Sequence, residues 1–378
     1  MGTTVCIGRS VGAGDKKQAA KVIDNTVTLF MVGSVVLAAA LVGLVDPIVR
    51  LISTPEEAVA GTTAYLTICF IGIPCITAYN VLASIFRGMG DSRSPMYFIA
   101  AACVVNIGLD FFFMGALRLG PAGAALGTTL SQAVSVLLAL CVILKRRSIR
   151  LSKSDFCPRK ATMKDILSIG LPVAAQDGFI QVSFMLITIM ANQRGLTDAA
   201  AVGIVEKIIS FLFLVPSSML STVSALGAQN IGAGKYDRVD DILRYAIAIG
   251  VGFGAVMALL MQFIAPSMVR PFTSDEAVVK AGAAYIRSYI FDCLFAGIQF
   301  SFSGYFCAWG RSGLSFLHNT LSILLVRVPG AWLACRFFPQ TLVPMGLAPA
   351  CGSLFSSIVC VLLYRWMKRQ NKPTGDKD

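Results

Sequence analysis

Ten long apolar runs dominate this chain of 378 residues and constrain its fold more than any other feature. Each is long enough to cross the hydrocarbon core of a bilayer, which takes a helix of roughly 20 residues. The sequence therefore predicts an all-α membrane protein with ten complete transmembrane helices. The predicted spans are residues 23–45, 58–85, 94–115, 122–144, 164–191, 198–227, 240–264, 280–306, 314–337 and 342–365.

Composition excludes several other classes of protein. Only 14% of the residues are charged, whereas a soluble domain carries about 25%, so the chain cannot cover itself with a water-compatible surface. The eleven cysteines form no C-x-x-C pair and there is a single histidine. This pattern argues against a disulfide scaffold and against a His/Cys zinc site.

The basic residues predict the orientation of the chain in the membrane. With alternating spans, 23 of the 32 Lys and Arg residues fall on one side and six on the other. Such an excess over short loops marks the cytoplasmic side. The net charge of +12 is therefore a topology signal, and we expect no nucleic-acid partner. We expect a multi-pass protein of the cytoplasmic membrane, with the basic segment Lys145–Lys164 and the C-terminus in the cytoplasm.

An internal repeat relates the two halves of the chain at a constant shift of 220 residues. Its matches extend over some eighty positions, more than shared hydrophobicity explains. Because both Gly-Ala-Gly loops are basic and cytoplasmic, the repeats run parallel, an architecture of transporters that bind substrate at the repeat interface. The matched positions include Gly12-Ala13-Gly14 with Gly232-Ala233-Gly234, Val49-Arg50 with Val269-Arg270, Glu56 with Glu276, Ala64-Tyr65 with Ala284-Tyr285, Phe86 with Phe306, Gly90 with Gly310 and Ser92 with Ser312.

The repeat also predicts the domain organisation. The second copy has two full helices, from about Lys164, before its Gly-Ala-Gly loop, whereas the first copy has only eleven residues. We therefore expect two parallel six-helix repeats whose first lobe lacks about one and a half helices, roughly 55–60 residues. The expected parts are an incomplete N-terminal lobe with the start of a basic linker at 1–150, a cytoplasmic linker at 151–163, a C-terminal lobe at 164–367 and a cytoplasmic tail at 368–378.

The segment Gly232-Ala233-Gly234-Lys235 superficially resembles a phosphate-binding loop. A Walker A motif needs Gly-x-x-x-x-Gly-Lys-Ser/Thr, and here Gln229 and Tyr236 occupy the first Gly and the Ser/Thr positions. We therefore interpret it as a tight turn between helices. The sequence contains no ATP site and no nucleophile–base pair, so we expect neither an enzyme nor a cofactor, and an ion gradient as the energy source.

Several blocks of the sequence are similar to the multidrug and toxin extrusion (MATE) transporters, and they cover the whole chain in order. This resemblance implies a two-lobe fold of twelve helices and export of small organic cations or drugs by antiport with Na⁺ or H⁺. The family's first helix, with its ion-linked Asp, has no counterpart here. The blocks are Gly12-Ala13-Gly14-Asp15-Lys16, Thr54-Pro55-Glu56, Phe86-Arg87-Gly88-Met89-Gly90-Asp91, Gly120-Pro121-Ala122-Gly123-Ala124-Ala125 and Gln229-Asn230-Ile231-Gly232-Ala233-Gly234.

Ionisable residues deep in a bilayer are costly and are candidate functional residues. Asp177 and Asp292 lie near the middle of their predicted spans, and Glu206 lies in the span between them. We expect these three to couple cations. Helical spacing adds polar and aromatic stripes that suit a bound cation. The predicted substrate-binding residues are Gln181, Phe184, Tyr285, Tyr289 and Gln299 in the second lobe, and Asn80 and Asn106 in the first.

Alternatives to this site remain open. In one alternative, the acidic residues form ion pairs with basic neighbours and only hold helices together. The candidate partners are Arg287, Arg327 and Lys207. Asp110 lies near the outer end of its helix, where it can reach water, and we interpret it as structural. In the family, the second-lobe ion site uses a Glu and an Asp, where this sequence has Ile180 or Gln181 and Ala296. Asp292 lies one turn from the second of these positions.

Three functions are compatible with the sequence. The first is an ion-coupled exporter of organic cations, which we expect to be a monomer in the lipid bilayer. The second is a flippase for a lipid-linked anionic substrate, for which Arg287 and Arg327 would bind phosphate. The third is a non-functional truncated paralogue.

Overall fold

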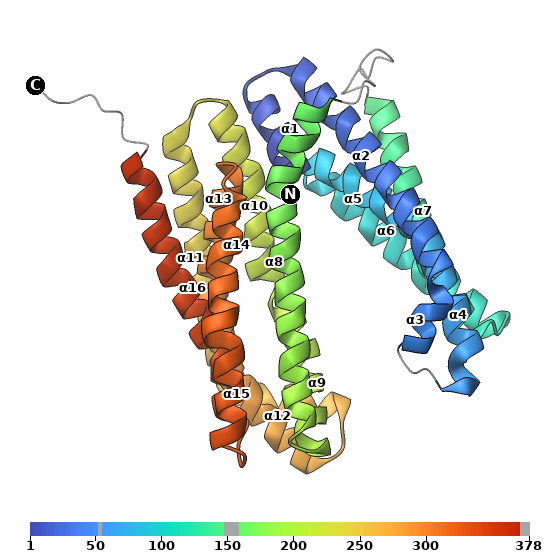
Figure 1. Cartoon of the computed structure of the whole chain (residues 1–378), viewed down its shortest axis with the longest axis vertical. Coiled ribbons are helices and arrows are strands. Elements are labelled where there is room, and N and C mark those ends of the chain that lie inside the picture. The colour runs from blue at the N-terminus through green and yellow to red at the C-terminus, as the bar shows by residue number, and fades with distance from the viewer. Residues whose placement is uncertain (52–54, 147–158, 371–378) are drawn as a thin grey trace, which may run out of the picture. The chain divides into compact units, whose positions relative to one another are not determined.

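A computed structural model of the chain describes residues 1–51, 55–146 and 159–370 (Figure 1). Every regular element in these ranges is a helix. The chain divides into two compact units, each described here by itself: an N-terminal unit, Thr3–Leu167, and a C-terminal unit, Ser168–Asp378 together with Met1–Gly2. Most of the predicted linker, 151–158, and most of the predicted tail, 371–378, lie outside the described residues, and the predicted lobe boundaries stay a prediction.

The N-terminal unit consists of helices and one π-helical turn. The short helix α1 matches the second half of α10 at the shift of 220 residues. The elements are α1 (Gly2–Gly12), α2 (Lys16–Gly43), α3 (Val45–Leu51), α4 (Glu56–Ile71), α5 (Ile73–Gly88), α6 (Arg93–Asp110), the π-helical turn η1 (Phe111–Ala116) and α7 (Gly120–Arg146).

The C-terminal unit starts within the long helix α8, which begins at Lys160, four residues before the predicted span. Its elements are α8 (Lys160–Asn192), α9 (Leu196–Leu212), α10 (Leu214–Gly232), α11 (Tyr236–Val269), the 3₁₀ turn η3 (Arg270–Phe272), α12 (Glu276–Tyr289), α13 (Phe291–Ala308), α14 (Ser312–Ser322), the π-helical turn η4 (Ile323–Arg327), α15 (Val328–Phe337) and α16 (Val343–Gln370).

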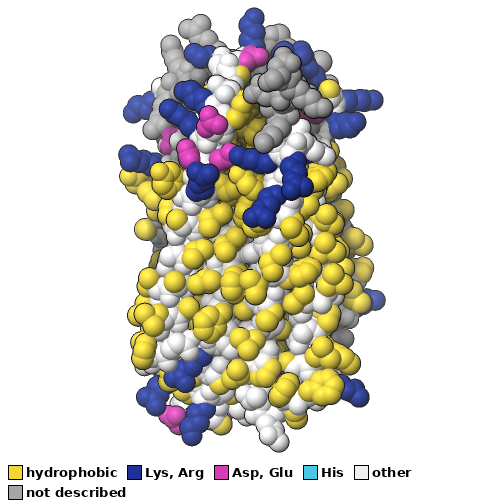
Figure 2. All heavy atoms as spheres, turned by 90° about the vertical axis from the view of Figure 1, so that its left-hand side faces the viewer, with side chains coloured by type: hydrophobic (Ala, Val, Ile, Leu, Met, Phe, Trp, Pro, Cys, Tyr) yellow, Lys and Arg dark blue, Asp and Glu magenta, His cyan; other side chains and the backbone are white. Residues whose placement is uncertain are grey.

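The predicted number of ten transmembrane helices is confirmed within the described ranges. Ten helices or helix pairs are long and apolar enough to cross a bilayer, from Lys16–Gly43 to Val343–Gln370. The face shown in Figure 2 carries a broad apolar band between two belts of charged side chains. This is the surface expected of a protein whose middle faces lipid and whose ends face water.

The two units repeat the same local structure, which confirms the internal repeat. Gly14 and Gly234 have φ angles of 72° and 71°, a left-handed conformation that glycine adopts without steric cost. In both loops the next amide closes the helix end: Asp15 N donates to Ser10 O at 2.9 Å and Lys235 N to Asn230 O at 2.8 Å. This is the hydrogen-bond pattern of a helix C-cap, so the Gly-Ala-Gly segments are tight turns, as predicted.

The packing follows the same repeat. In the N-terminal unit α2 packs against α5 and α4 against α7; in the C-terminal unit α11 packs against α13 and α12 against α16. A second pair of turns matches as well, because Asp91 N donates to Phe86 O at 2.9 Å and Arg311 N to Phe306 O at 2.8 Å. The repeat is therefore one of structure and of sequence.

Several spans of the C-terminal unit are interrupted, and prolines explain part of this. A proline leaves the carbonyl four residues earlier without its helical donor, and in lipid that carbonyl needs another partner. Pro216 frees the carbonyl of Leu212, which accepts from Cys293 Sγ at 3.9 Å. Pro172 lies inside α8 without interrupting it, and the carbonyl of Ser168 that it frees accepts from Ser312 Oγ at 3.1 Å.

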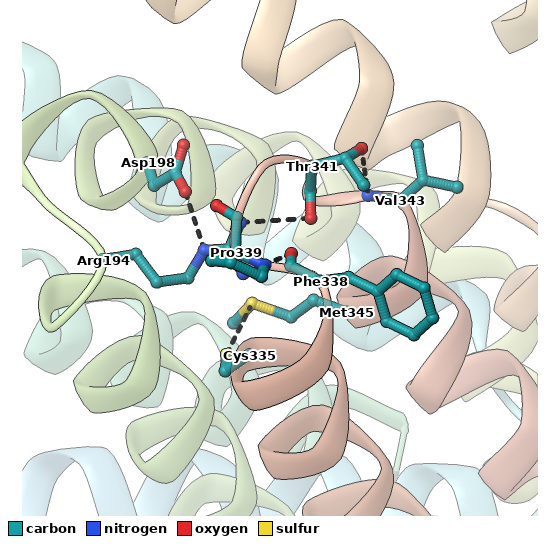
Figure 3. Close-up of polar contacts among 8 residues, drawn as sticks. All are labelled: Arg194, Asp198, Cys335, Phe338, Pro339, Thr341, Val343 and Met345. Atoms are coloured by element: carbon teal, nitrogen blue, oxygen red, sulfur yellow. Dashed lines mark hydrogen bonds and ion pairs between the residues drawn. The ribbon is translucent and has the colours of Figure 1, made fainter.

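One arginine joins two hairpins at the end of the C-terminal unit (Figure 3). Arg194, in the turn between α8 and α9, is 6% exposed and its Nε donates to Asp198 at 2.7 Å. Its Nη1 donates to the carbonyl of Phe338 at 3.1 Å, and its Nη2 to the carbonyls of Pro339 at 2.9 Å and Thr341 at 3.1 Å. These carbonyls follow α15, whose C-terminal end favours a positive charge.

Replacing Arg194 with Ala is expected to destabilise the C-terminal unit by about 1–3 kcal/mol, because it leaves the partly buried Asp198 and three carbonyls without their donor. Arg270→Ala is the matched control: its ion pair with Glu276 is 63% and 64% exposed, and we expect a loss of less than about 1 kcal/mol. Thermal unfolding followed by tryptophan fluorescence measures this unit, because Trp309, Trp332 and Trp366 all lie in it. Equal effects of the two substitutions would contradict the role of Arg194.

Candidate functional site

Asp292 lies at the midpoint of the span Glu276–Ala308, directly after the interruption between α12 and α13. Its side chain is 0% exposed. Ser353 is a near neighbour, yet neither carboxylate oxygen has a hydrogen-bond partner among the described residues. A buried polar group without a partner is costly, so this carboxylate marks a position that a cation or a proton would stabilise.

Arg327 is the charged neighbour of Asp292. It lies at the end of the π-helical turn η4, two residues before Pro329, and is 8% exposed. Its Nη2 donates to the hydroxyl of Tyr289 at 2.9 Å, and its guanidinium lies 4.7 Å from the centre of the Phe184 ring. The Nε atom has no hydrogen-bond partner among the described residues.

Glu206 completes the charges of this cluster. One of its carboxylate oxygens accepts from Thr188 Oγ1 at 3.0 Å, which joins α9 to α8. Arg327 interacts electrostatically with both Glu206 and Asp292, but no direct ion pair joins it to either in the part of the chain that the structure describes. With both carboxylates ionised, two negative charges and one positive charge therefore lie together in the interior of this unit.

Aromatic rings form one wall of the cluster. The rings of Tyr285 and Tyr289 lie 5.6 Å apart, and the ring of Phe213 lies 6.5 Å from that of Tyr289. Phe213 is the residue at which α9 and α10 separate. The hydroxyl of Tyr285 is buried without a hydrogen-bond partner among the described residues. Aromatic faces and hydroxyl groups beside carboxylates can hold an organic cation.

Gln299 lies next to this cluster: it is buried, and its Nε2 donates at 3.0 Å to Ser353 Oγ, the neighbour of Asp292. Three other predicted site residues lie elsewhere. Asp177 and Gln181 lie on the exposed face of α8, and Asn80 is exposed on α5, where its side chain donates to the carbonyl of Ile76 at 3.0 Å. The structure thus brings together Asp292, Glu206, Phe184, Tyr285 and Tyr289, with Gln299 beside them.

A second polar network fills the C-terminal unit beside this cluster. The ring of His318 is fully buried, with Nε2 2.9 Å from Ser303 Oγ and Nδ1 2.7 Å from Ser356 Oγ. On the same helix α14, Ser315 donates to Gln176 at 2.6 Å. Both nitrogens of the histidine are satisfied, so the network ties α13, α14 and α16 together as interhelical hydrogen bonds do in membranes.

The N-terminal unit contains a smaller polar pair on α6. Asn106 and Asp110 lie one turn apart directly before η1 and face Gly127 of α7. Asn106 Nδ2 and one oxygen of Asp110 are buried without hydrogen-bond partners among the described residues. Asp110 as a whole is partly exposed, while the close approach of α7 at a glycine covers this oxygen.

Two residues that organise these sites, Arg327 and Gly127, are not among the predicted site residues. The sequence suggests Arg327 only as a partner in structural ion pairs or as a phosphate ligand, and it gives no signal for Gly127. A signal for Arg327 was its place two residues before a proline inside a span. No three His, Cys, Asp or Glu side chains gather at one point within the described ranges, so carboxylates together with amide or hydroxyl groups are the available cation ligands.

Comparisons with known proteins agree with this architecture. A family model described as MatE matches residues 1–112 and 172–333. The chain is 29% identical over 367 residues to the probable multidrug resistance protein YpnP of Bacillus subtilis, covering 96% of this chain and 81% of the relative. It is 24% identical over 339 residues to the FAD transporter of Shewanella oneidensis, covering 88% and 75%.

A solved structure has the same fold. An outward-facing structure of a multidrug resistance MATE family transporter matches with a TM-score of 0.92 at 22% identity, covering 98% of this chain and 83% of that one. This likeness supports the arrangement of helices within the units. It does not transfer a substrate.

Gly127→Ala is expected to disturb the Asn106–Asp110 pair. An added Cβ would lie 3.5 Å from Asn106 Nδ2 and closer still to Asp110, so we expect a loss of about 1–3 kcal/mol of stability from overpacking. Gly108→Ala is the control, because nothing lies within 4 Å of its added Cβ; alanine there gains up to about 1 kcal/mol of helix propensity. Thermal unfolding with a thiol-reactive dye measures both. A Gly127→Ala variant as stable as Gly108→Ala would show that the pair is not packed against α7.

Proposed function

The chain belongs to the MatE family of multidrug and toxin extrusion transporters, and we propose that it exports small organic cations by antiport with Na⁺ or H⁺. Members of this family are transporters and not enzymes. The antiport, the substrate class, the cytoplasmic membrane, the cytoplasmic C-terminus and the monomeric state are parts of this proposal.

One observation carries the proposal: the carboxylate of Asp292 is completely buried at the midpoint of a span and has no hydrogen-bond partner among the described residues. An ionised group is costly there unless a charge balances it. Arg327 balances one of the two carboxylates in the cluster, and a coupling ion or a cationic substrate balances the other.

Antiport follows when these two cations compete. Asp292, Glu206 and Arg327 together carry one net negative charge. A Na⁺ or H⁺ that enters from outside neutralises this charge, so the cationic substrate is released. The membrane potential contributes about 2.3 kcal/mol per charge moved across 100 mV. Inward movement of the coupling ion is therefore favoured, and it supplies free energy for export.

The aromatic wall suits an organic cation. The guanidinium of Arg327 lies over the ring of Phe184, 4.7 Å from its centre, so an aromatic face already stabilises one positive charge in this cluster. Rings at this distance contribute roughly 0.5–2 kcal/mol to cation binding, depending on desolvation. We assign Phe184, Tyr285 and Tyr289 to the substrate and Asp292 and Glu206 to cation coupling, and Gln299 is a further candidate beside Asp292. Asp177, Gln181 and Asn80 stay weaker candidates, because they lie outside the cluster.

The N-terminal unit offers a second candidate for the coupling cation. An amide and a carboxylate, Asn106 and Asp110, present buried atoms without partners, and oxygen ligands of this kind suit Na⁺. We propose that Asp110 with Asn106 binds a coupling ion in this unit. The predicted lobes, linker and tail remain part of the proposal.

An anionic substrate is the second candidate function. Arg327 is buried with an unpartnered Nε atom, which suits a phosphate group, and a relative is named an FAD transporter. The cluster as a whole favours cations, because Asp292 and Glu206 outnumber Arg327. Export of a phosphate-bearing dye in preference to a cationic dye would support this alternative.

Asp292→Asn keeps the size of the side chain and removes its charge, so we expect gradient-driven efflux of a cationic dye to fall by at least about tenfold. Dye efflux from cells or vesicles, with an imposed Na⁺ or proton gradient, measures it. The matched control is Asp241→Asn, whose carboxylate is 57% exposed, and we expect efflux at the parental rate. Efflux by Asp292→Asn at the parental rate, with the same ion dependence, would refute the assignment.

A further inference from the structure

We infer that Arg327 is an internal cation that limits the C-terminal unit to one additional positive charge. The inference rests on the proposed cation export and deepens it: the preferred substrates are monovalent organic cations, and the coupling ion and the substrate exclude each other because of charge. The juxtaposition that carries it is a buried arginine that interacts electrostatically with two carboxylates and pairs directly with neither among the described residues.

The charges of the cluster set this limit. Arg327 interacts electrostatically with Asp292, Glu206, Tyr285 and Tyr289, and its guanidinium remains protonated in proteins. Asp292 and Glu206 together carry two negative charges when ionised. The cluster therefore has a net charge of −1. One monovalent cation neutralises it, whereas a second cation or a dication would leave a net positive charge in the interior.

The contacts of Arg327 leave its charge available. Its hydrogen bond goes to a neutral hydroxyl, that of Tyr289, and its face rests on the neutral ring of Phe184. No direct ion pair with Asp292 or Glu206 fixes it within the described residues. A guanidinium held in this way can balance the charge of either carboxylate. When a cation binds one carboxylate, Arg327 balances the charge of the other.

The unpartnered atoms point to the same place. Asp292, Tyr285 and Arg327 all present buried polar atoms that have no hydrogen-bond partner among the described residues. They belong to α12, α13 and η4, and the hydrogen bond from Arg327 to Tyr289 joins η4 to the end of α12, where α12 and α13 separate. Buried groups of both signs without partners fit a site whose occupant changes, whereas a purely structural ion pair would satisfy them.

The experiment measures binding to the purified full chain in detergent, with tetraphenylphosphonium as the monovalent probe and methyl viologen as the divalent probe. Each probe is titrated at several Na⁺ concentrations and at several pH values. The variants are Arg327→Met, Arg327→Lys and the double variant Asp292→Asn/Arg327→Met, with Asp292→Asn alone for comparison. Arg287→Met is the control, because the side chain of Arg287 is exposed on α12.

In the parental chain, the coupling ion weakens tetraphenylphosphonium binding in proportion to its concentration, and methyl viologen binds poorly. In Arg327→Met, with two free carboxylates, we expect the competition to disappear and methyl viologen to bind about tenfold more tightly. Arg327→Lys keeps the charge, so both parental properties persist. Arg287→Met behaves like the parent.

The double variant tests whether binding depends on the net charge of the cluster or on the carboxylate of Asp292 itself. Asp292→Asn alone leaves a net charge of zero, and we expect weak binding of tetraphenylphosphonium. Removing Arg327 as well restores a net charge of −1, so binding and competition return. If Arg327→Met does not fold, as judged by size-exclusion chromatography, this rescue by the double variant decides the question.

Two results overturn the inference: unchanged competition and unchanged probe preference in a folded Arg327→Met, or no rescue of binding in the folded double variant. Failure of the proposed function looks different. In that case the parental chain itself shows no effect of Na⁺ or pH on tetraphenylphosphonium binding.

Discussion

A charge buried in an apolar medium must be balanced nearby, and this constraint governs the C-terminal unit. Asp292 and Arg327 are 0% and 8% exposed, and each has polar atoms without a hydrogen-bond partner among the described residues. In water such groups would be screened and inexpensive; inside a lipid-facing bundle they are costly. Opposite charges, hydroxyl groups and aromatic faces surround the cluster, and in the proposed function a mobile cation completes its balance.

The interrupted helices make room for this cluster. α9 and α10 separate at Phe213, α12 and α13 at Ile290, and the π-helical turn η4 ends at Arg327. In unbroken helices the backbone groups bond within the helix, which leaves no irregular surface where a small ion or an organic cation could bind. The carbonyl that Pro216 frees is covered by Cys293, beside Asp292, so the bend and the buried charge are neighbours in the structure.

The sequence predicts the fold well because its signals are local or regular. Span lengths give ten helices, and the constant shift of 220 residues gives the repeat, since Gly14 and Gly234 must adopt the same left-handed turn. Part of the site is predicted too: helix counting places Asp292 at midspan, and helical spacing puts Phe184 and Glu206 on stripes that meet.

The role of Arg327 is not predictable in this way. Arg327 is the last residue of the π-helical turn η4, and such a turn changes the direction of its side chains relative to an unbroken α-helix, so helical spacing does not show which residues it faces. The pairing of Asn106 and Asp110 with Gly127 depends on the packing of two helices, which residue types alone do not encode.

In the proposed mechanism, one net negative charge in the C-terminal unit binds either the substrate or the coupling ion. Counting the ions released when the purified chain binds tetraphenylphosphonium tests this competition, with a Na⁺-selective electrode and a pH indicator in weakly buffered detergent solution. We expect Na⁺ and H⁺ released together to amount to one positive charge for each tetraphenylphosphonium bound. Binding of the probe without release of any cation would refute the competition for one charge.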